Sequence, residues 1–100
     1  MPQVQPCRGD PPSEDEIEAR FRSDGLQPRA WANAPGDRYG WHDHEYHKVL
    51  YCLAGSIDFH TPDGDFALRA GDRLDIEPGT RHAATVGPDG VRCIEAARQP

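Results

Sequence analysis

Apolar and polar positions alternate in short runs from Leu26 onward, and Pro, Gly, Asp and Asn separate these runs at intervals of about ten residues. Runs this short, with turn-forming residues between them, predict β-strands rather than helices. We expect strands at residues 27–33, 40–44, 48–53, 56–61, 65–69, 73–77, 82–86 and 92–96. Tight turns between so many short strands favour a closed or nearly closed barrel, because an open sheet of this size has exposed edges. The pattern therefore predicts an all-β barrel over residues 26–98.

Two of the predicted turns contain residues with well-defined turn chemistry. Residues 62–64, with the sequence Pro-Asp-Gly, combine a fixed φ, a side-chain acceptor and a residue that tolerates positive φ. Residues 87–90, with the sequence Gly-Pro-Asp-Gly, offer the same combination. We expect the chain to reverse direction at both places.

The N-terminal segment follows a different pattern. Residues 1–12 contain four prolines and no apolar periodicity. Ordering such a segment costs conformational entropy and buries little apolar surface in return. We therefore expect residues 1–12 to form a flexible arm.

A short helix is predicted over residues 13–25. Ser13 is followed three positions later by Glu16, which matches the capping box that satisfies the first free amides of a helix. Ile17 and Phe21 are four positions apart and so share one face of the helix. We expect this helix to pack on the barrel through these two side chains.

Size, composition and charge limit the possible functions. The chain has 100 residues, which is the size of one domain, and its hydrophobic fraction of 36% predicts a modest core. A net charge of -6, with no run of Lys or Arg, repels nucleic acid. No stretch approaches the roughly 20 apolar residues that span a bilayer, and the first residues lack the pattern of a secretion signal. We expect a soluble cytoplasmic protein that binds neither nucleic acid nor membrane.

The cysteines do not predict a disulfide framework. Cys7, Cys52 and Cys93 are odd in number and lack metal-knuckle spacing. Cys52 and Cys93 lie inside apolar runs, where a free thiol behaves as a small hydrophobic side chain. We expect both to be buried.

The histidines offer the strongest indication of chemistry. His42 and His44 are two positions apart on a predicted strand, so both imidazoles can point to one face of the sheet. His82 follows a predicted turn and could bring a third imidazole from a returning strand. Three His ligands with open positions for water or substrate suit Zn, Mn, Fe, Ni or Cu. The spacing alone is weakly specific, because paired histidines on strands are often surface residues.

The surrounding residues resemble the two motifs of the cupin family. The first motif is matched by Gly36, His42-Asp43-His44, Lys48 and Gly55, and the second by Gly71-Asp72, Pro78-Gly79 and His82. Together these matches cover residues 36–86. The resemblance implies a cupin-type β-barrel, or jelly roll, in which two His and a Glu of the first motif and the His of the second bind one metal. By resemblance, His42, His44 and His82 take the histidine places.

One ligand of the family pattern is missing. Lys48 stands at the glutamate position, and an ammonium group has no lone pair for a metal while it keeps its proton. Three arrangements remain open: His47 is the fourth ligand through a local bulge, water completes a three-His site, or Lys48 replaces the charge of the metal in a metal-free pocket. Only one of His47 and Lys48 can point into the barrel, and a shift of the strand by one residue changes which of them does.

Two classes of function follow from the resemblance. The first is a metal-dependent enzyme acting on a small molecule, of the isomerase, dioxygenase or decarboxylase type, and the sequence does not choose among these reactions. The second is a non-catalytic domain that binds or senses a small molecule, with or without metal. In either class Arg81, next to His82, could meet a substrate carboxylate at the mouth of the barrel.

The strand at residues 48–53 also bears on assembly. Its apolar residues occupy both faces, so something outside the barrel must cover the second face. The N-terminal helix or a second copy of the chain could do so. We expect a homodimer.

Overall fold

Two long bent strands organise the fold. In the computed structural model, which describes residues 2–99, strands β4 (His47–Thr61) and β7 (His82–Arg98) pair antiparallel along most of their length. The other elements are β1 (Gln3–Gln5), α1 (Glu14–Ser23), β2 (Arg29–Asn33), β3 (Arg38–His42), β5 (Gly64–Arg69) and β6 (Arg73–Ile76).

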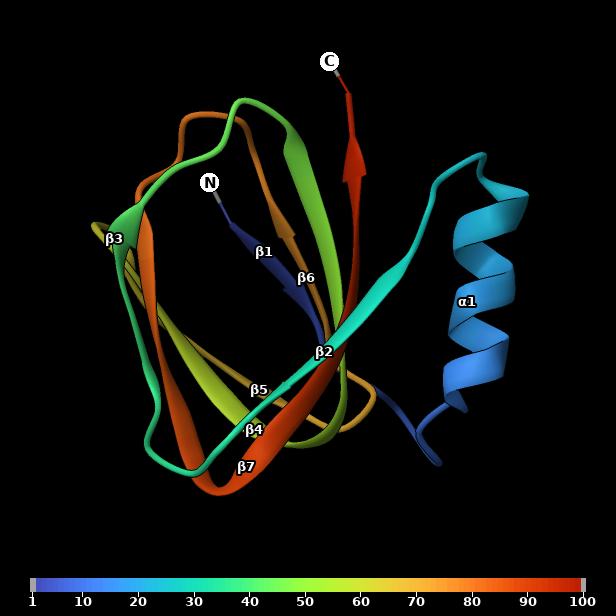
Figure 1. The fold of residues 1–100 in the computed structure, drawn as a ribbon, viewed down its shortest axis with the longest axis horizontal. Helices are drawn as coiled ribbons and strands as arrows, with labels where there is room; N and C mark the ends of the chain where they lie inside the picture. The colour runs from blue at the N-terminus through green and yellow to red at the C-terminus, as the bar shows by residue number, and fades with distance from the viewer. Residues whose placement is uncertain (1, 100) are drawn as a thin grey trace.

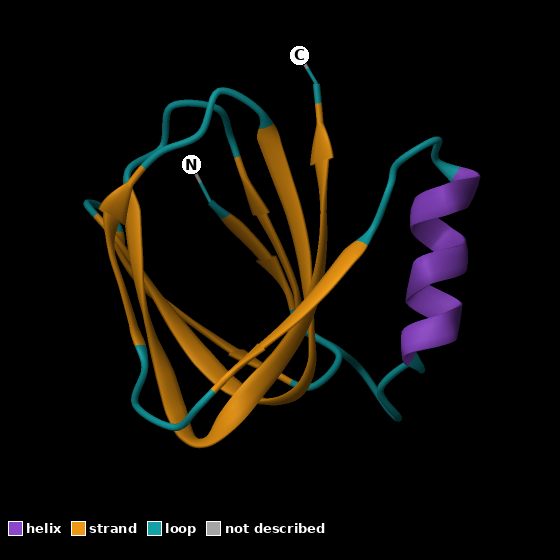
Figure 2. Cartoon of the chain, in the orientation of Figure 1, coloured by secondary structure: helices purple, strands orange, loops and turns teal. Residues whose placement is uncertain are grey.

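Each long strand belongs to both sides of a barrel. The first half of β4 pairs with β6 and with the second half of β7, and β1 and β2 continue this side at its edges. The second half of β4 pairs with β5 and with the first half of β7, which also pairs with β3. The sheet curls round on itself, and α1 packs on its outside (Figures 1 and 2). The prediction of an all-β barrel with one short helix is confirmed.

The predicted strand boundaries need correction, and the turn expected at residues 87–90 lies within a single strand. The strands expected at 48–53 and 56–61 are one strand, β4, and those expected at 82–86 and 92–96 are one strand, β7. The chain bends instead of ending because the pairing register shifts around Gly55, whose φ is +74°. A Cβ atom at Gly55 would lie 2.0 Å from the carbonyl oxygen of Gly90, so only glycine permits this close crossing of the two strands.

Alternate residues of β4 and β7 point into the barrel. They form an inner core, whose fully buried members include Leu50, Cys52, Ile57 and Cys93. Cys52 and Cys93 are buried free thiols, as predicted from the apolar runs around them. Two further members of this core, Phe59 and Ala84, lie beside the histidines in the cavity described below.

The opposite face of the same strands packs against α1. Ile17 and Phe21 of the helix are buried together with Val49, Tyr51 and Ile94 of the sheet. Ser13 caps the helix, its hydroxyl accepting a hydrogen bond from an amide three positions later, as the sequence predicts. Among residues 2–99 no helix is long and apolar enough to cross a membrane.

This packing bears on the predicted homodimer. The apolar outer face of β4, which suggested a second copy of the chain, is covered by the chain's own helix. The homodimer stays a prediction, but this face of β4 no longer supports it, because α1 already covers the face.

The N-terminal segment contains more regular structure than expected. Residues 3–5, inside the arm predicted over 1–12, form the edge strand β1 beside β6, with Val4 opposite Leu74. The Cys7 amide then donates a hydrogen bond of 2.8 Å to the carboxylate of Asp72. The sequence pattern missed this strand because it is three residues long and gains its hydrogen bonds from a distant part of the chain.

A cluster of polar side chains lies on the outer face, beside α1. Asp75 accepts hydrogen bonds from the Arg73 guanidinium at 2.7 and 3.1 Å, and its carboxylate lies 2.8 Å from Nε2 of His47. Burial alone would raise the pKa of Asp75, but the hydrogen bonds from Arg73 and His47 outweigh it and lower this pKa.

We expect Ile17→Ala to lower the free energy of unfolding by about 2–5 kcal/mol, because it removes the side chain that fixes α1 to the sheet and leaves a cavity. Urea unfolding measures this loss. Glu18→Ala on the exposed side of the helix is the control, since it removes only a surface ion pair with Arg22 worth about 0.3–0.5 kcal/mol. Equal losses in the two variants would show that α1 does not depend on this contact.

We expect Asp75→Asn to lower the free energy of unfolding by about 1–3 kcal/mol at pH 7, because Arg73 loses its charged acceptor. The lowered pKa means that the carboxylate stabilises the fold above its ordinary pKa of about 3.9, and that this contribution is lost as pH falls through the folded-state value. Urea titrations should therefore show a smaller difference at pH 3 than at pH 7. Asp58→Asn, an exposed substitution on β4, should have little effect at either pH. A constant loss at Asp75 across this range would contradict the assignment.

Candidate metal centre

Three histidines from two distant parts of the sequence meet inside the barrel. His42, His44 and His82 each offer a ring nitrogen, and these three atoms lie within 4.8 Å of one another. The ring centroids are 4.3 Å apart for His42 and His82, 4.9 Å for His42 and His44, and 5.2 Å for His44 and His82. The structure thus brings together three of the four residues that the sequence singled out.

The sheet positions two of these rings directly. His42 ends β3 and His82 begins β7, and the two are cross-strand partners, which places their side chains next to each other. His44 differs from expectation, because β3 ends at His42 and not at residue 44. The loop after β3 holds His44 instead: the Gly79 amide donates to its carbonyl oxygen at 2.8 Å, and its ring stacks on Tyr46 at 4.7 Å.

Hydrogen bonds to the backbone select the tautomer of two rings. Nδ1 of His42 lies 2.7 Å from the carbonyl oxygen of Gly40, and Nδ1 of His82 lies 2.9 Å from that of Thr80. A carbonyl oxygen only accepts, so each Nδ1 carries the proton and donates. Nε2 then keeps its lone pair, which is the arrangement that metal-binding histidines adopt.

Two of the ring nitrogens in the cluster have no hydrogen-bond partner. Among residues 2–99, Nε2 of His44 and Nε2 of His82 are the buried side-chain polar atoms without a hydrogen bond. Burial lowers the pKa of His44 and of His82, so both rings stay neutral near pH 7. Unpaired buried acceptors cost free energy, and a divalent cation at this point would satisfy them. The donor set therefore fits a metal ion.

The three rings form part of the wall of a cavity of about 250 Å³. The other lining residues are mostly aromatic or charged: Arg29, Trp31, Tyr39, Tyr46, Lys48, Phe59, Ala84 and Glu95. One water molecule takes up about 30 Å³ in the liquid, so a cavity of this volume can hold several waters or one small organic molecule. Trp31 and Tyr39 are thus part of the cavity wall.

Lys48 lies in this cavity and is paired. It is 8% exposed, and its Nζ is 3.3 Å from Oε1 of Glu95. The same Glu95 oxygen accepts a hydrogen bond of 2.6 Å from Nε1 of Trp31. The ammonium charge is therefore balanced by a carboxylate and does not stand alone beside the histidines.

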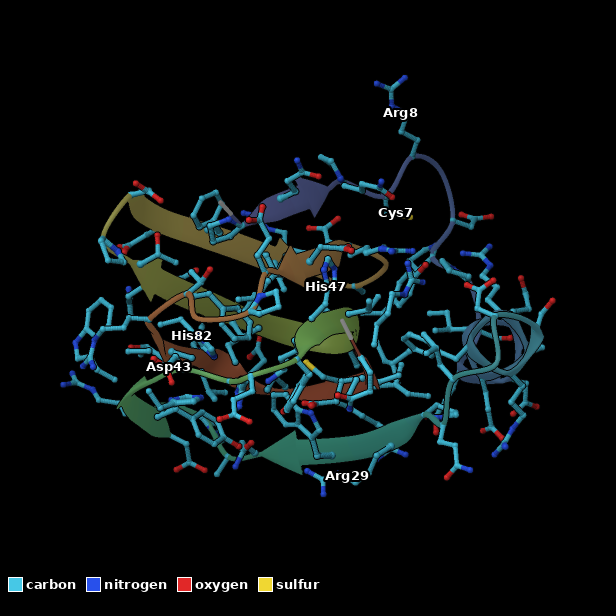
Figure 3. All side chains as sticks on the ribbon, turned by 90° about the horizontal axis from the view of Figure 1, so that it is seen from above. Cys7, Arg8, Arg29, Asp43, His47 and His82 are labelled. Carbon is cyan, nitrogen blue, oxygen red and sulfur yellow. The ribbon has the colours of Figure 1, made fainter. Side chains whose placement is uncertain are left out.

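The structure does not bring His47, the fourth candidate ligand, to the cluster. Successive residues of a strand point to opposite faces, and Lys48 points inward together with Leu50, so His47 points outward. There its Nε2 contacts Asp75. His47 and His82 lie well apart in Figure 3. No bulge occurs between His47 and Lys48 to reverse these directions.

Sequence reasoning missed the charged partners of the site. Glu95 is the single acidic residue in the otherwise largely apolar run 91–97, and this isolation was the available signal that it points into the barrel. Arg29, on β2, is also among the residues that line the cavity. Arg81, which the sequence suggested for a substrate carboxylate, is exposed and is not among the residues that line the cavity.

Comparison with solved structures finds the same fold in several proteins. A DUF861 family protein from Thermotoga maritima has a TM-score of 0.68 at 15% identity, over 98% of this chain and 100% of that chain. An RmlC-like cupin from Shewanella frigidimarina has a TM-score of 0.65 at 24% identity, over 72% of this chain and 64% of that one. At these identities the likeness shows the fold alone.

A further similar structure is among the crystal structures of the DMSP lyases RdDddP and RnDddQII. Its TM-score is 0.68 at 26% identity, and the match covers 73% of this chain and 38% of the other. This chain thus corresponds to less than half of that protein. No curated protein sequence matches this chain.

The sequence profile of the cupin domain matches residues 31–95, which is more than half of the chain. The matched segment runs from β2 to the second half of β7 and includes all three histidines of the cluster and the Lys48–Glu95 pair. The chain belongs to the cupin family.

Proposed function

We propose that this protein binds one divalent transition metal through His42, His44 and His82, and that it binds or transforms a small molecule in the cavity beside that metal. The observation that carries the proposal is the pair of buried, unpartnered Nε2 atoms of His44 and His82. They lie in a cluster whose three ring nitrogens converge within 4.8 Å.

The geometry favours a three-His site whose remaining positions are open to water or to a ligand. His47 is held on the other face by Asp75, and Nζ of Lys48 is occupied by its ion pair with Glu95. Neither side chain therefore supplies a fourth lone pair. Three protein ligands with an open position are typical of metal sites that act on a substrate.

A divalent ion in this position would polarise a carbonyl or enediol oxygen, or activate water or dioxygen. The protein residues contribute the setting: imidazoles from β3, from the loop after it and from β7, aromatic walls around the ligand, and the ion-paired amine of Lys48. The DMSP lyase structures support a small-molecule enzyme by analogy, but the short overlap gives no ground for transferring their reaction.

The alternative is a binding or sensing domain in which Lys48 takes the place of the metal. The burial of Lys48 in the cavity favours this alternative, and its ion pair with Glu95 counts against it. An ammonium whose charge is already balanced does not substitute for a divalent cation, and it leaves the two buried Nε2 atoms unsatisfied. We therefore favour the metal site.

Elemental analysis of the tag-free protein, purified without chelators, tests the proposal. We expect about one transition metal per chain in the wild type, and almost none in His42→Ala/His44→Ala, because one remaining imidazole does not hold the ion. The metal identified would be Zn, Mn, Fe, Ni or Cu.

His47→Ala is the matched control, because it removes an imidazole close in sequence and outside the cluster. It should keep the metal content of the wild type. Wild-type protein that contains no metal, and that takes up none of the five ions when they are added, would overturn the proposed metal site. Loss of metal in His47→Ala alone would show that His47 reaches the ion.

A further inference from the structure

The cavity beside the histidines carries an excess of positive charge in an acidic protein. The whole chain has a net charge of -6. Two cations, Arg29 and Lys48, face the cavity against one carboxylate, that of Glu95. Glu95 is the one carboxylate among the described residues that line the cavity, so the lining does not cancel this excess. A bound divalent ion would add two further positive charges.

Lys48 is the unusual member of this group. It is the only lysine in the chain, and its exposed fraction is only 8%. Replacing a buried ion pair with apolar side chains is often neutral or even stabilising, so packing does not require a lysine at this position. An ammonium has three N–H donors, and its ion pair with Oε1 of Glu95 needs one of them, so donors remain for the cavity that Lys48 lines.

We propose that the cavity selects small organic carboxylates, with Lys48 as the residue that binds the carboxylate group. This inference rests on the proposed small-molecule function of the cavity and names its substrate class. A carboxylate oxygen accepts a charge-assisted hydrogen bond from the ammonium, while the apolar part of the ligand packs on the aromatic walls, Trp31 and Phe59 among them. Arg29, at the exposed edge of the cavity, adds attraction for an anion as it enters.

The surroundings favour a carboxylate over a phosphate. Proteins hold phosphate with helix N-termini, glycine-rich loops or several arginines. In the described part of the chain α1 packs on the outside of the barrel, and one buried ammonium is the main donor inside it. A planar monoanion with an apolar body matches this combination.

The test uses benzoate and its neutral analogue benzamide as probes. Isothermal titration calorimetry of the zinc-loaded protein should show that benzoate binds at least tenfold more tightly than benzamide. In Lys48→Met, which has a similar length and no charge, benzoate should lose at least tenfold in affinity while benzamide changes little. Benzoate binding to Lys48→Met within twofold of the wild type would overturn the role of Lys48.

Arg81→Met is the control for net charge. It removes one positive charge from an exposed position outside the cavity, and should leave both affinities within twofold of the wild type. A loss of benzoate affinity in Arg81→Met equal to that in Lys48→Met would assign the preference to the overall field of the protein. Inorganic phosphate that displaces benzoate at equal concentration would also overturn the carboxylate assignment.

The same titrations without zinc separate this inference from the metal proposal. If the wild type takes up no metal, the metal proposal fails, and a benzoate preference that disappears in Lys48→Met still supports the carboxylate site. A metal-free protein without that preference contradicts both.

A measurement on the wild type avoids any dependence on folding of the variant. Because Lys48 is the only lysine, protein labelled with ¹⁵N-lysine has a single side-chain ammonium signal. Benzoate should shift this signal and benzamide should not. A signal that neither probe moves would overturn the inference.

Discussion

The antiparallel pairing of β4 with β7 is the interaction on which the rest of the structure depends. Both strands bend where Gly55 and Gly90 approach each other, so each strand contributes to both sides of the barrel. The bend lets β7 deliver His82 from its first residue and Glu95 from near its end to one cavity. On β4, Leu50 pairs with Glu95, which places Lys48 two positions away on the same face and diagonally adjacent to that carboxylate. The crossing of two strands thus sets the geometry of both the histidine cluster and the ion pair.

The charges inside the barrel follow from what burial permits. Imidazoles lose little on burial because they can become neutral, and the backbone carbonyls at Gly40 and Thr80 fix the proton on Nδ1. Burying a charged lysine costs more free energy unless an anion lies beside it, and here Glu95 is that anion. In the family pattern a glutamate contributes its negative charge to the metal. Here the acid neutralises Lys48 instead, so a metal held by three neutral rings would keep its full charge for an incoming ligand.

Local sequence signals predicted the parts of this protein that are local in origin. The capping residue Ser13, the apolar pair on α1 and the turn at residues 62–64 all act within a few positions of the chain, and each is found where expected. The cupin motifs likewise indicated His42, His44 and His82. The contacts that sequence reasoning missed join residues far apart: β1 with β6, Lys48 with Glu95, and the two halves of each bent strand. Their partners depend on sheet register, and no short stretch of sequence encodes it.

Register also connects the outside of the barrel with its chemistry. A shift of β4 by one residue would move Lys48 out of the cavity and His47 into it, which would change an ion-paired cation into a fourth imidazole. Val49 and Tyr51 oppose such a shift, because they pack under Ile17 and Phe21 of α1, while Leu50 and Cys52 fill the inner core. Moving any of them to the other face would expose apolar surface on one side and overfill the other. The helix takes no part in the cavity, yet by holding the outer face of β4 it determines which side chain faces the histidines.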